Sequence, residues 1–388
     1  MPPPPRMSGR RAGGRLLAIL AAALVLAVGA AGPSDEWDSR RIGSDERPTR
    51  QLASEVRLPA CAAVVASLTP RARLAQRLMV GVDASDPVET AVLVRATQVG
   101  GVFFAGDATG LLRDQALRGV QAVARLPVAV AVDDEGGRVQ RIDALDGQLP
   151  SARRLAREHT PEEVRALGQE RGIALRARGV TMNFAPTVDL GGRPARDVIG
   201  DRAYSADPAV VARYAGAFAA GQRSAGILPV LKHFPGHGRA DGDSHRGRVA
   251  TPPLAELRAA DLRPYAELLG GGPAGVMVGH LDVPGLTGEM PSSLTPETYT
   301  LLRTEYGFDG LVLTDDLGAM RAVSARFALP EAVLRALEAG ADMALWSAGG
   351  PVDPVLAALA RALAAGELDP AANDRAVVRV LTAKGVCA

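Results

Sequence analysis

The sequence has few aromatic residues, only two cysteines and no marked excess of charge of either sign. Aromatic residues make up 4% of the 388 residues, which argues against a surface that stacks on nucleic-acid bases. The formal net charge is +1 and no block of like charges exceeds a few residues, so binding to nucleic acid through bulk charge is excluded. Because 47% of the residues are hydrophobic, the chain can instead bury a large core.

The N-terminus lacks a long membrane-spanning run, although it has the features of an export signal. Four arginines precede the apolar run 16–32, and small residues near its end offer cleavage positions. A transmembrane helix needs roughly 20 strongly apolar residues, and this run is shorter and rich in alanine. We predict a cleaved signal peptide at 1–31, with a retained membrane anchor as the alternative, and a secreted or cell-envelope protein.

The segment that follows is charged and has no periodic apolar positions. Residues 32–57 therefore predict a flexible polar spacer, with an ordered arm as the alternative, ahead of a domain at 58–388. Cys61 and Cys387 lie near the two ends of this domain, and in an oxidising compartment they can form one disulfide. We favour that disulfide over two free thiols.

From residue 70 onward the sequence repeats a short apolar run, a polar or glycine-rich loop and an amphipathic helix pattern. Continuous apolar runs, rather than alternating ones, are typical of parallel strands covered on both faces. Strands are predicted within 77–82, 99–106, 127–133, 180–186, 227–233, 274–280, 310–316 and 341–347.

The helix patterns between these runs complete the prediction of fold class. Those at 161–179 and 208–226 begin at proline, have acidic residues in or just before the first turn, and end at glycine. Eight strands alternating with helices predict an α/β fold, a single (β/α)8 barrel of the TIM type. A doubly wound open sheet would need a glycine-rich phosphate loop after the first strand, and GVDASD at 81–86 offers none.

Polar residues follow several of the predicted strands. Asp133, Lys232, His233, His280 and Asp315 each come at the end of an apolar run. A charged group there is costly unless it is solvated or paired, and the active sites of TIM barrels lie at the C-terminal ends of the strands. These residues therefore predict one site at the mouth of the barrel.

These residues belong to longer motifs that resemble the bacterial β-N-acetylglucosaminidases of glycoside hydrolase family 3. KHFPGHG followed by DSH, at 232–245, is similar to the signature of that family, and GLVLTDDLGAM at 310–320 is similar to its nucleophile segment. Four other segments match in order: VDDEGGRVQR (132–141), LPSARRLA (149–156), FAPTVDL (184–190) and VIGDRAYS (198–205). Two positions depart from the family pattern: Arg239–Ala240 replace a common Asp-Thr, and Asp134 replaces a common Gln or His.

The resemblance implies a retaining, two-step hydrolysis. Asp315 would attack the anomeric carbon and form a covalent glycosyl-enzyme, while Asp316 or Thr314 would cap the next helix. His245, oriented by Asp243, would be the acid/base, since an imidazole has an ordinary pKa of about 6.5 and needs little tuning for this role. The glycines around this pair predict a loop that moves in to complete the site.

Sugar binding would fall to side chains near the strand ends. Charged partners discriminate polyols because a missing hydroxyl leaves a buried group unpaired. Met277 resembles a residue on the acetamido side of the pocket, with ordinary strand packing as the alternative, and His237 is expected to be structural. The predicted substrate-binding residues are Asp133 as acceptor, Arg141, Arg202, Lys232 and His233 as donors, and Met277.

The expected function is an exported, monomeric exo-β-N-acetylglucosaminidase that uses no cofactor and no metal. Its substrate would be a peptidoglycan fragment (a muropeptide) or a chitin oligosaccharide containing N-acetylglucosamine. A phosphorylase on the same scaffold is the first alternative, because a neutral imidazole at His245 would not repel phosphate and Arg239 could attract it.

Two further alternatives are disfavoured by the residues themselves. In a metal-dependent barrel hydrolase we expect paired ligands at fixed offsets, whereas Phe-Pro-Gly separates His233 from His237. A non-catalytic sugar-binding protein would not need Asp315 together with the His245–Asp243 pair.

Overall fold

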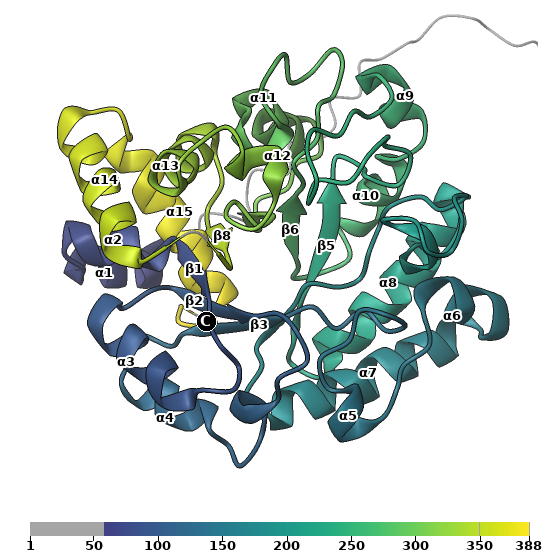
Figure 1. Cartoon of the computed structure of the whole chain (residues 1–388), viewed down its shortest axis with the longest axis horizontal. Coiled ribbons are helices and arrows are strands. Elements are labelled where there is room, and N and C mark those ends of the chain that lie inside the picture. The colour runs from purple at the N-terminus through teal and green to yellow at the C-terminus, as the bar shows by residue number, and fades with distance from the viewer. Residues whose placement is uncertain (1–57, 349, 388) are drawn as a thin grey trace, which may run out of the picture. The chain divides into compact units, whose positions relative to one another are not determined.

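The computed structural model of the protein describes residues 58–348 and 350–387, and within these residues eight parallel strands form an almost closed barrel (Figure 1). The strand order is β7-β6-β5-β4-β3-β2-β1-β8, and a bridge between Leu313 and Met343 brings β7 next to β8. Each predicted apolar run coincides with one strand, although β5 extends one residue beyond its run, and this confirms the (β/α)8 prediction. The strands are β1 Leu78–Gly81, β2 Gly101–Phe104, β3 Ala129–Val132, β4 Met182–Asn183, β5 Leu228–Phe234, β6 Gly275–Val278, β7 Leu311–Thr314 and β8 Ala344–Trp346.

Helices occupy the connections between the strands and cover the outside of the barrel (Figure 1). They are α1 Leu58–Ser67, α2 Pro70–Gln76, α3 Pro87–Thr97, α4 Leu117–Ala122, α5 Asp143–Asp146, α6 Ala152–Glu158, α7 Pro161–Ala177, α8 Pro208–Ser224, α9 Leu254–Ala259, α10 Arg263–Leu268, α11 Pro296–Thr300, α12 Arg321–Ser324, α13 Leu329–Ala339, α14 Val352–Ala365 and α15 Pro370–Ala383. Short helical turns lie at η1 Gly110–Leu112, η2 Gly200–Arg202, η3 Ser292–Leu294 and η4 Leu301–Glu305.

Helices α7 and α8 show how local sequence sets this arrangement. α7 begins with a capping box, in which Thr160 accepts from the backbone of Glu163 and the Glu163 side chain accepts from the backbone of Thr160. The two helices lie side by side (Figure 1). Gly221 permits this contact, because a Cβ there would lie 2.2 Å from the carbonyl oxygen of Arg165.

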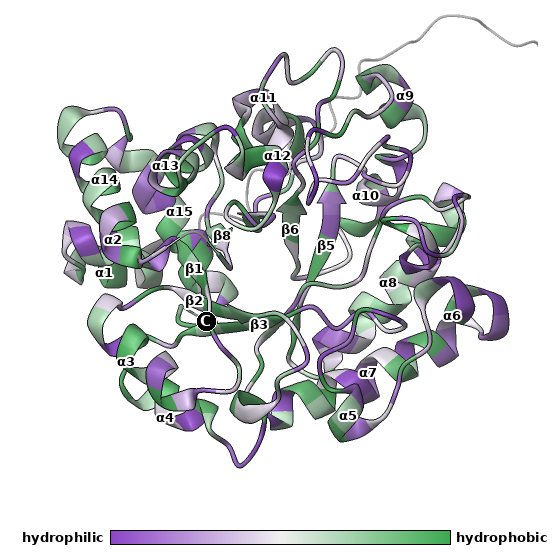
Figure 2. Cartoon of the chain, in the orientation of Figure 1, coloured by the Kyte–Doolittle hydropathy of each residue, from purple (hydrophilic) through white to green (hydrophobic). Residues whose placement is uncertain are grey.

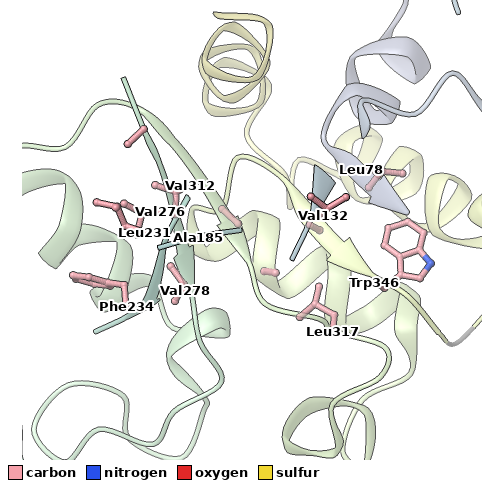
Figure 3. Close-up of a cluster of buried hydrophobic side chains, with 14 of the residues drawn as sticks. Leu78, Val132, Ala185, Leu231, Phe234, Val276, Val278, Val312, Leu317 and Trp346 are labelled. Atoms are coloured by element: carbon pink, nitrogen blue, oxygen red, sulfur yellow. The ribbon is translucent and has the colours of Figure 1, made fainter. Parts of the chain in front are cut away.

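The strands consist mainly of apolar residues, as Figure 2 shows for β3 and β6, and every residue of these two strands is buried. Side chains on the inner face, among them Phe103 and Phe184 with ring centroids 5.2 Å apart, fill the interior of the barrel. Side chains on the outer face pack against the helices, and Figure 3 shows part of this cluster, including Val276, Val312 and Trp346. Two packed layers therefore fix the strand ends that carry the polar residues.

The two cysteines are joined by a disulfide between Cys61 in α1 and Cys387 after α15, with their Cα atoms 5.2 Å apart. It ties the first described helix to the end of the domain. No helix among residues 58–348 and 350–387 has the length and apolar character needed to span a membrane. The predicted signal peptide at 1–31 and spacer at 32–57 lie outside the described residues.

Candidate active site

The C-terminal ends of β3 and β5 bring two carboxylates and two cations into one cluster. Lys232 Nζ lies 2.5 Å from Asp133 Oδ1 and 2.6 Å from Glu135 Oε1. Arg202 in η2 donates to both oxygens of Glu135, at 2.8 and 2.7 Å. The side chains of Lys232 and Glu135 are 2% and 3% exposed, whereas that of Asp133 is 22% exposed. Three of the predicted sugar-binding residues therefore meet here, and Asp133 is the member most accessible to a substrate.

The opposite charges of this cluster keep Glu135 and Lys232 ionised. Burial alone would raise the pKa of Glu135, but Arg202 and Lys232 hold that pKa well below its usual range. Burial alone would lower the pKa of Lys232, but Asp133 and Glu135 hold it above its ordinary value. Glu135 thus fixes the position of both cations, and sequence reasoning missed it because Arg202 is 67 residues away in the chain.

A second carboxylate, Asp189, holds the loop after β5. Its Oδ2 lies 2.6 Å from His233 Nδ1, and its Oδ1 accepts the backbone N–H of His237 at 2.6 Å. Burial raises the pKa of Asp189, but His233 more than offsets that effect, so the carboxylate accepts the proton of Nδ1. This fixes the orientation of the His233 ring and leaves Nε2 for other contacts. Asp189 follows β4, so the strand-end rule could have found it.

The two adjacent aspartates after β7 have different surroundings. Asp316 Oδ1 accepts the backbone N–H groups of Gly318 and Ala319 at 2.9 and 2.8 Å. Its carboxylate also accepts the N–H of Ser347 at 3.1 Å and the hydroxyl of the same residue. Asp316 therefore holds the turn after the strand, rather than capping the next helix as expected, because the N-cap of α12 is Met320.

His280 fixes the backbone beside this pair. Its Nε2 lies 3.0 Å from the carbonyl oxygen of Asp316, and its Nδ1 lies 2.7 Å from Ser293 Oγ. A carbonyl oxygen only accepts, so Nε2 carries the proton, and the neutral ring accepts the Ser293 hydroxyl at Nδ1. Burial lowers the pKa of His280, which is consistent with a neutral ring at this position.

Asp315 is buried but ionised. Its side chain is 7% exposed, and its Oδ1 accepts the backbone N–H of Asp316 at 2.9 Å. Burial raises the pKa of Asp315, yet the neighbouring His233 and this N–H bring the pKa below its ordinary value. A buried carboxylate held in its anionic form is what a covalent nucleophile requires.

The predicted His245–Asp243 pair is in contact. Asp243 Oδ1 lies 2.9 Å from His245 Nδ1 and accepts the backbone N–H of His245 at 3.0 Å. Burial raises the pKa of Asp243, but these two bonds bring it below the ordinary value. The side chain of His245 is 59% exposed and that of Asp243 is 26% exposed.

The segment carrying this pair contacts the chain just after Asp315. The backbone N–H of Ala322 donates to the carbonyl oxygen of Ser244 at 3.0 Å, and Ser244 Oγ lies 3.5 Å from Met320 Sδ. Ser244 is 3% exposed. The residue before His245 is therefore packed against the segment that follows the candidate nucleophile.

Other predicted residues lie in different surroundings. Arg141 donates from Nη1 to the carbonyl oxygen of Gln140 at 2.7 Å, and none of its hydrogen bonds joins the cluster around Lys232. Met277 is 2% exposed and packs in the interior of the barrel, so its observed contacts are those of a strand residue. Asp134 is fully buried against Arg171, at 3.1 Å, and points away from the site.

Arg239 does not serve as an open anion site. Its Nε and Nη2 donate to Asp261 Oδ2 at 2.9 and 2.6 Å, so its charge is already paired. This removes the support that Arg239 gave to phosphate binding. Among the described residues, no group of three or more His, Cys, Asp or Glu side chains is arranged to hold a metal ion.

Comparison with known proteins agrees with this geometry. Residues 69–383 match the family model described as the glycosyl hydrolase family 3 N terminal domain. The chain belongs to glycosyl hydrolase family 3. This family 3 chain is 49% identical over 384 residues to the beta-hexosaminidase LpqI of Mycobacterium tuberculosis, covering 96% of the chain and 97% of that relative.

Solved structures of family 3 proteins share the fold. M. tuberculosis LpqI has 52% identity and a TM-score of 0.81, covering 84% of this chain and 96% of its own. A family 3 glycosyl hydrolase from Mycobacterium smegmatis has 51% identity and a TM-score of 0.80, covering 82% and 98%. A family 3 β-N-acetylglucosaminidase from Paenibacillus sp. has 31% identity and a TM-score of 0.77, covering 83% and 63%.

Proposed function

We propose that this protein is a retaining exo-β-N-acetylglucosaminidase, with Asp315 as nucleophile and the His245–Asp243 pair as acid/base. The observation that carries the proposal is the difference between Asp315 and Asp316. Asp316 is occupied by backbone N–H groups and Ser347, whereas Asp315 is buried, anionic and flanked by His233 and His280. The names of the relatives, β-hexosaminidase and β-N-acetylglucosaminidase, support the reaction type.

In the first step, an Asp315 carboxylate oxygen bonds to the anomeric carbon while the glycosidic C–O bond breaks. His245 gives the proton on Nε2 to the leaving oxygen, and Asp243 stabilises the ring through Nδ1. In the second step, the neutral imidazole takes a proton from water, whose oxygen attacks the same carbon and releases Asp315. Two inversions at that carbon retain the β configuration.

The cluster around Lys232 supports recognition of the terminal sugar. Asp133 would accept hydrogen bonds from sugar hydroxyls, while Lys232, Arg202 and His233 would donate. Because Glu135 and Asp189 hold these donors in fixed positions, little side-chain ordering remains when the sugar binds.

For the substrate, we propose N-acetylglucosamine linked β-1,4 to N-acetylmuramic acid in peptidoglycan fragments, encountered after export. The support is the export signal predicted at 1–31, since peptidoglycan lies outside the cytoplasmic membrane. Chitin oligosaccharides have the same non-reducing sugar and are the alternative substrate.

The test is product analysis with a muropeptide disaccharide and with chitobiose, each in phosphate-free buffer and in phosphate buffer. We expect free N-acetylglucosamine in both buffers, first seen by NMR as the β-anomer, and a higher kcat/KM for the muropeptide. N-acetylglucosamine 1-phosphate in phosphate buffer would make the protein a phosphorylase. An α-anomer as first product would refute the retaining mechanism.

A further inference from the structure

The segment that carries His245 and Asp243 is a closed turn. Asp241 and Ala250 exchange backbone hydrogen bonds of 2.8 and 3.4 Å, which close the chain between them. Within it, the carbonyl oxygen of Asp243 accepts the N–H groups of Arg246 and Gly247 at 2.8 and 3.1 Å. We call residues 242–249 the dyad turn. Its position depends on what holds its two ends.

Ion pairs hold both ends of the dyad turn, but they differ in burial. Arg193 contacts Asp241 at 2.6 Å, and the Asp241 carboxylate is 86% exposed. Arg248 contacts Asp282 at 2.7 Å, and the Arg248 side chain is 61% exposed. The exposed pair at Asp241 is screened by solvent and holds the start of the turn weakly. The far end is better anchored, because Asp282 is 16% exposed and its backbone N–H donates to the carbonyl oxygen of Val249 at 2.7 Å.

The pair between Arg239 and Asp261 is different. Arg239 lies two residues before Asp241, and it places both Nε and Nη2 on one oxygen of a carboxylate that is 0% exposed. Gly236 packs on the same carboxylate side chain, since a Cβ there would lie 2.6 Å from Asp261 Cβ. A buried carboxylate with an arginine partner is a geometrically demanding contact, because the planar guanidinium fixes direction as well as distance.

The tip of the dyad turn is held on the opposite side. Ser244 accepts the backbone N–H of Ala322, in the segment that follows Asp315. The chain from Arg239 through the dyad turn therefore runs from the Arg239–Asp261 pair, beside α9 and α10, to the nucleophile segment after β7. A change at Arg239 would alter the start of the turn while the contact at Ser244 remains.

We propose that Arg239 is a positioning residue for the acid/base: its ion pair with the buried carboxylate of Asp261 anchors the start of the dyad turn so that His245 is held in place for proton transfer. The inference rests on the proposed function. Arg239 is one of the two positions where the sequence departs from the family pattern.

The test compares two leaving groups. Chitobiose needs protonation of its leaving oxygen, whereas 2,4-dinitrophenyl β-N-acetylglucosaminide does not, so only the first depends on a well-placed acid. For Arg239→Ala we expect kcat/KM on chitobiose to fall on the order of 10–100-fold, because a small misplacement of a catalytic group lowers the rate by that much. The kcat/KM on the activated substrate should fall by less than about threefold, since the sugar site is unchanged. Arg239→Lys, which keeps the charge but not the planar fork, should be intermediate.

The matched control is Arg258→Ala, which removes another arginine–carboxylate pair, that of Arg258 in α9 with Glu305 at 2.6 Å, both exposed. This variant should leave kcat/KM unchanged on both substrates. Burst amplitude with the activated substrate counts folded active sites, and Asp261→Asn replaces Arg239→Ala if the latter does not fold.

Equal losses on both substrates, or no loss on either, would overturn the positioning role. Failure of wild type to cleave either substrate would instead refute the proposed function, so the two failures are distinguishable.

Discussion

Glu135→Gln removes the carboxylate that holds Arg202 and Lys232 without changing the size of the side chain. Glu135 is 3% exposed and receives two bonds from Arg202 and one from Lys232, between 2.6 and 2.8 Å. A glutamine presents one N–H₂ group to partners that only donate, so at least one cation loses its acceptor. Breaking a buried ion pair by removing one partner costs about 3–5 kcal/mol. For a domain of this size that corresponds to a fall in Tm of about 4–7 °C.

The pH dependence gives this prediction a second measurement. Arg202 and Lys232 depress the pKa of Glu135 in the folded state, so its contribution is complete above the unfolded-state pKa of about 4.3. That contribution is lost as pH falls from there toward the lower folded-state pKa. We therefore expect the difference in unfolding free energy between wild type and Glu135→Gln to be constant from about pH 8 to 5 and to shrink below about pH 4.

Urea unfolding at several pH values measures this difference, and steady-state kinetics should show a raised KM because the sugar donors lose their support. Glu331→Gln is the control, since Glu331 pairs with Arg335 on the surface of α13 and is 48% exposed. It should cost less than about 0.5 kcal/mol. A destabilisation below about 1 kcal/mol for Glu135→Gln, or one that does not change with pH, would refute the reasoning.

Three further predictions concern the proposed chemistry and the disulfide. Asp315→Asn should fold normally and lose at least about 10³-fold in kcat, while Asp316→Ala should lower the Tm because the turn loses its cap; substantial turnover by Asp315→Asn would refute the mechanism. His245→Ala should lower kcat/KM about 10²–10⁴-fold on chitobiose but much less on an activated aryl glycoside, and an equal loss on both would argue against the acid role. Cys387→Ser should cost about 4–6 kcal/mol in the chain-entropy model for a separation of 326 residues, measured by urea unfolding under oxidising conditions; an unchanged midpoint would show that the bridge adds no stability.

The barrel could be predicted because continuous apolar runs report burial on both faces, and each strand carries that signal locally. The lengths could not. The run 180–186 contains a strand of only two residues, Met182–Asn183. The Asn183 side chain bonds to both the N–H and the carbonyl oxygen of Asp134, at 2.9 Å each, where a longer strand would use its backbone. The use of side-chain bonds in place of backbone bonds depends on the register of β4 with β3, which a single sequence does not reveal.

The candidate site could be predicted where a residue touches a strand end. Asp133, Lys232 and Asp315 all follow buried runs, and the structure brings them to one end of the barrel. Glu135 and Ser293 carry no such pattern, since their roles come from partners supplied by other connections. Arg141 shows the converse, because its place in a motif did not determine which groups it contacts.

The surroundings of Asp315 explain why one of two adjacent, equally buried carboxylates is suited to attack a carbon. Both are 7% exposed, so desolvation is similar for the two. The Asp316 carboxylate accepts hydrogen bonds from backbone N–H groups and a hydroxyl, and these bonds hold a turn. A carboxylate with so many hydrogen bonds is a poor nucleophile. Asp315 keeps its negative charge through the nearby His233 and a single N–H, with fewer hydrogen bonds to break before it reacts. A carboxylate whose charge is stabilised by neighbouring groups, with few direct hydrogen bonds, keeps a reactive oxygen. Asp315 is in this state because the turn after β7 folds onto Asp316 instead.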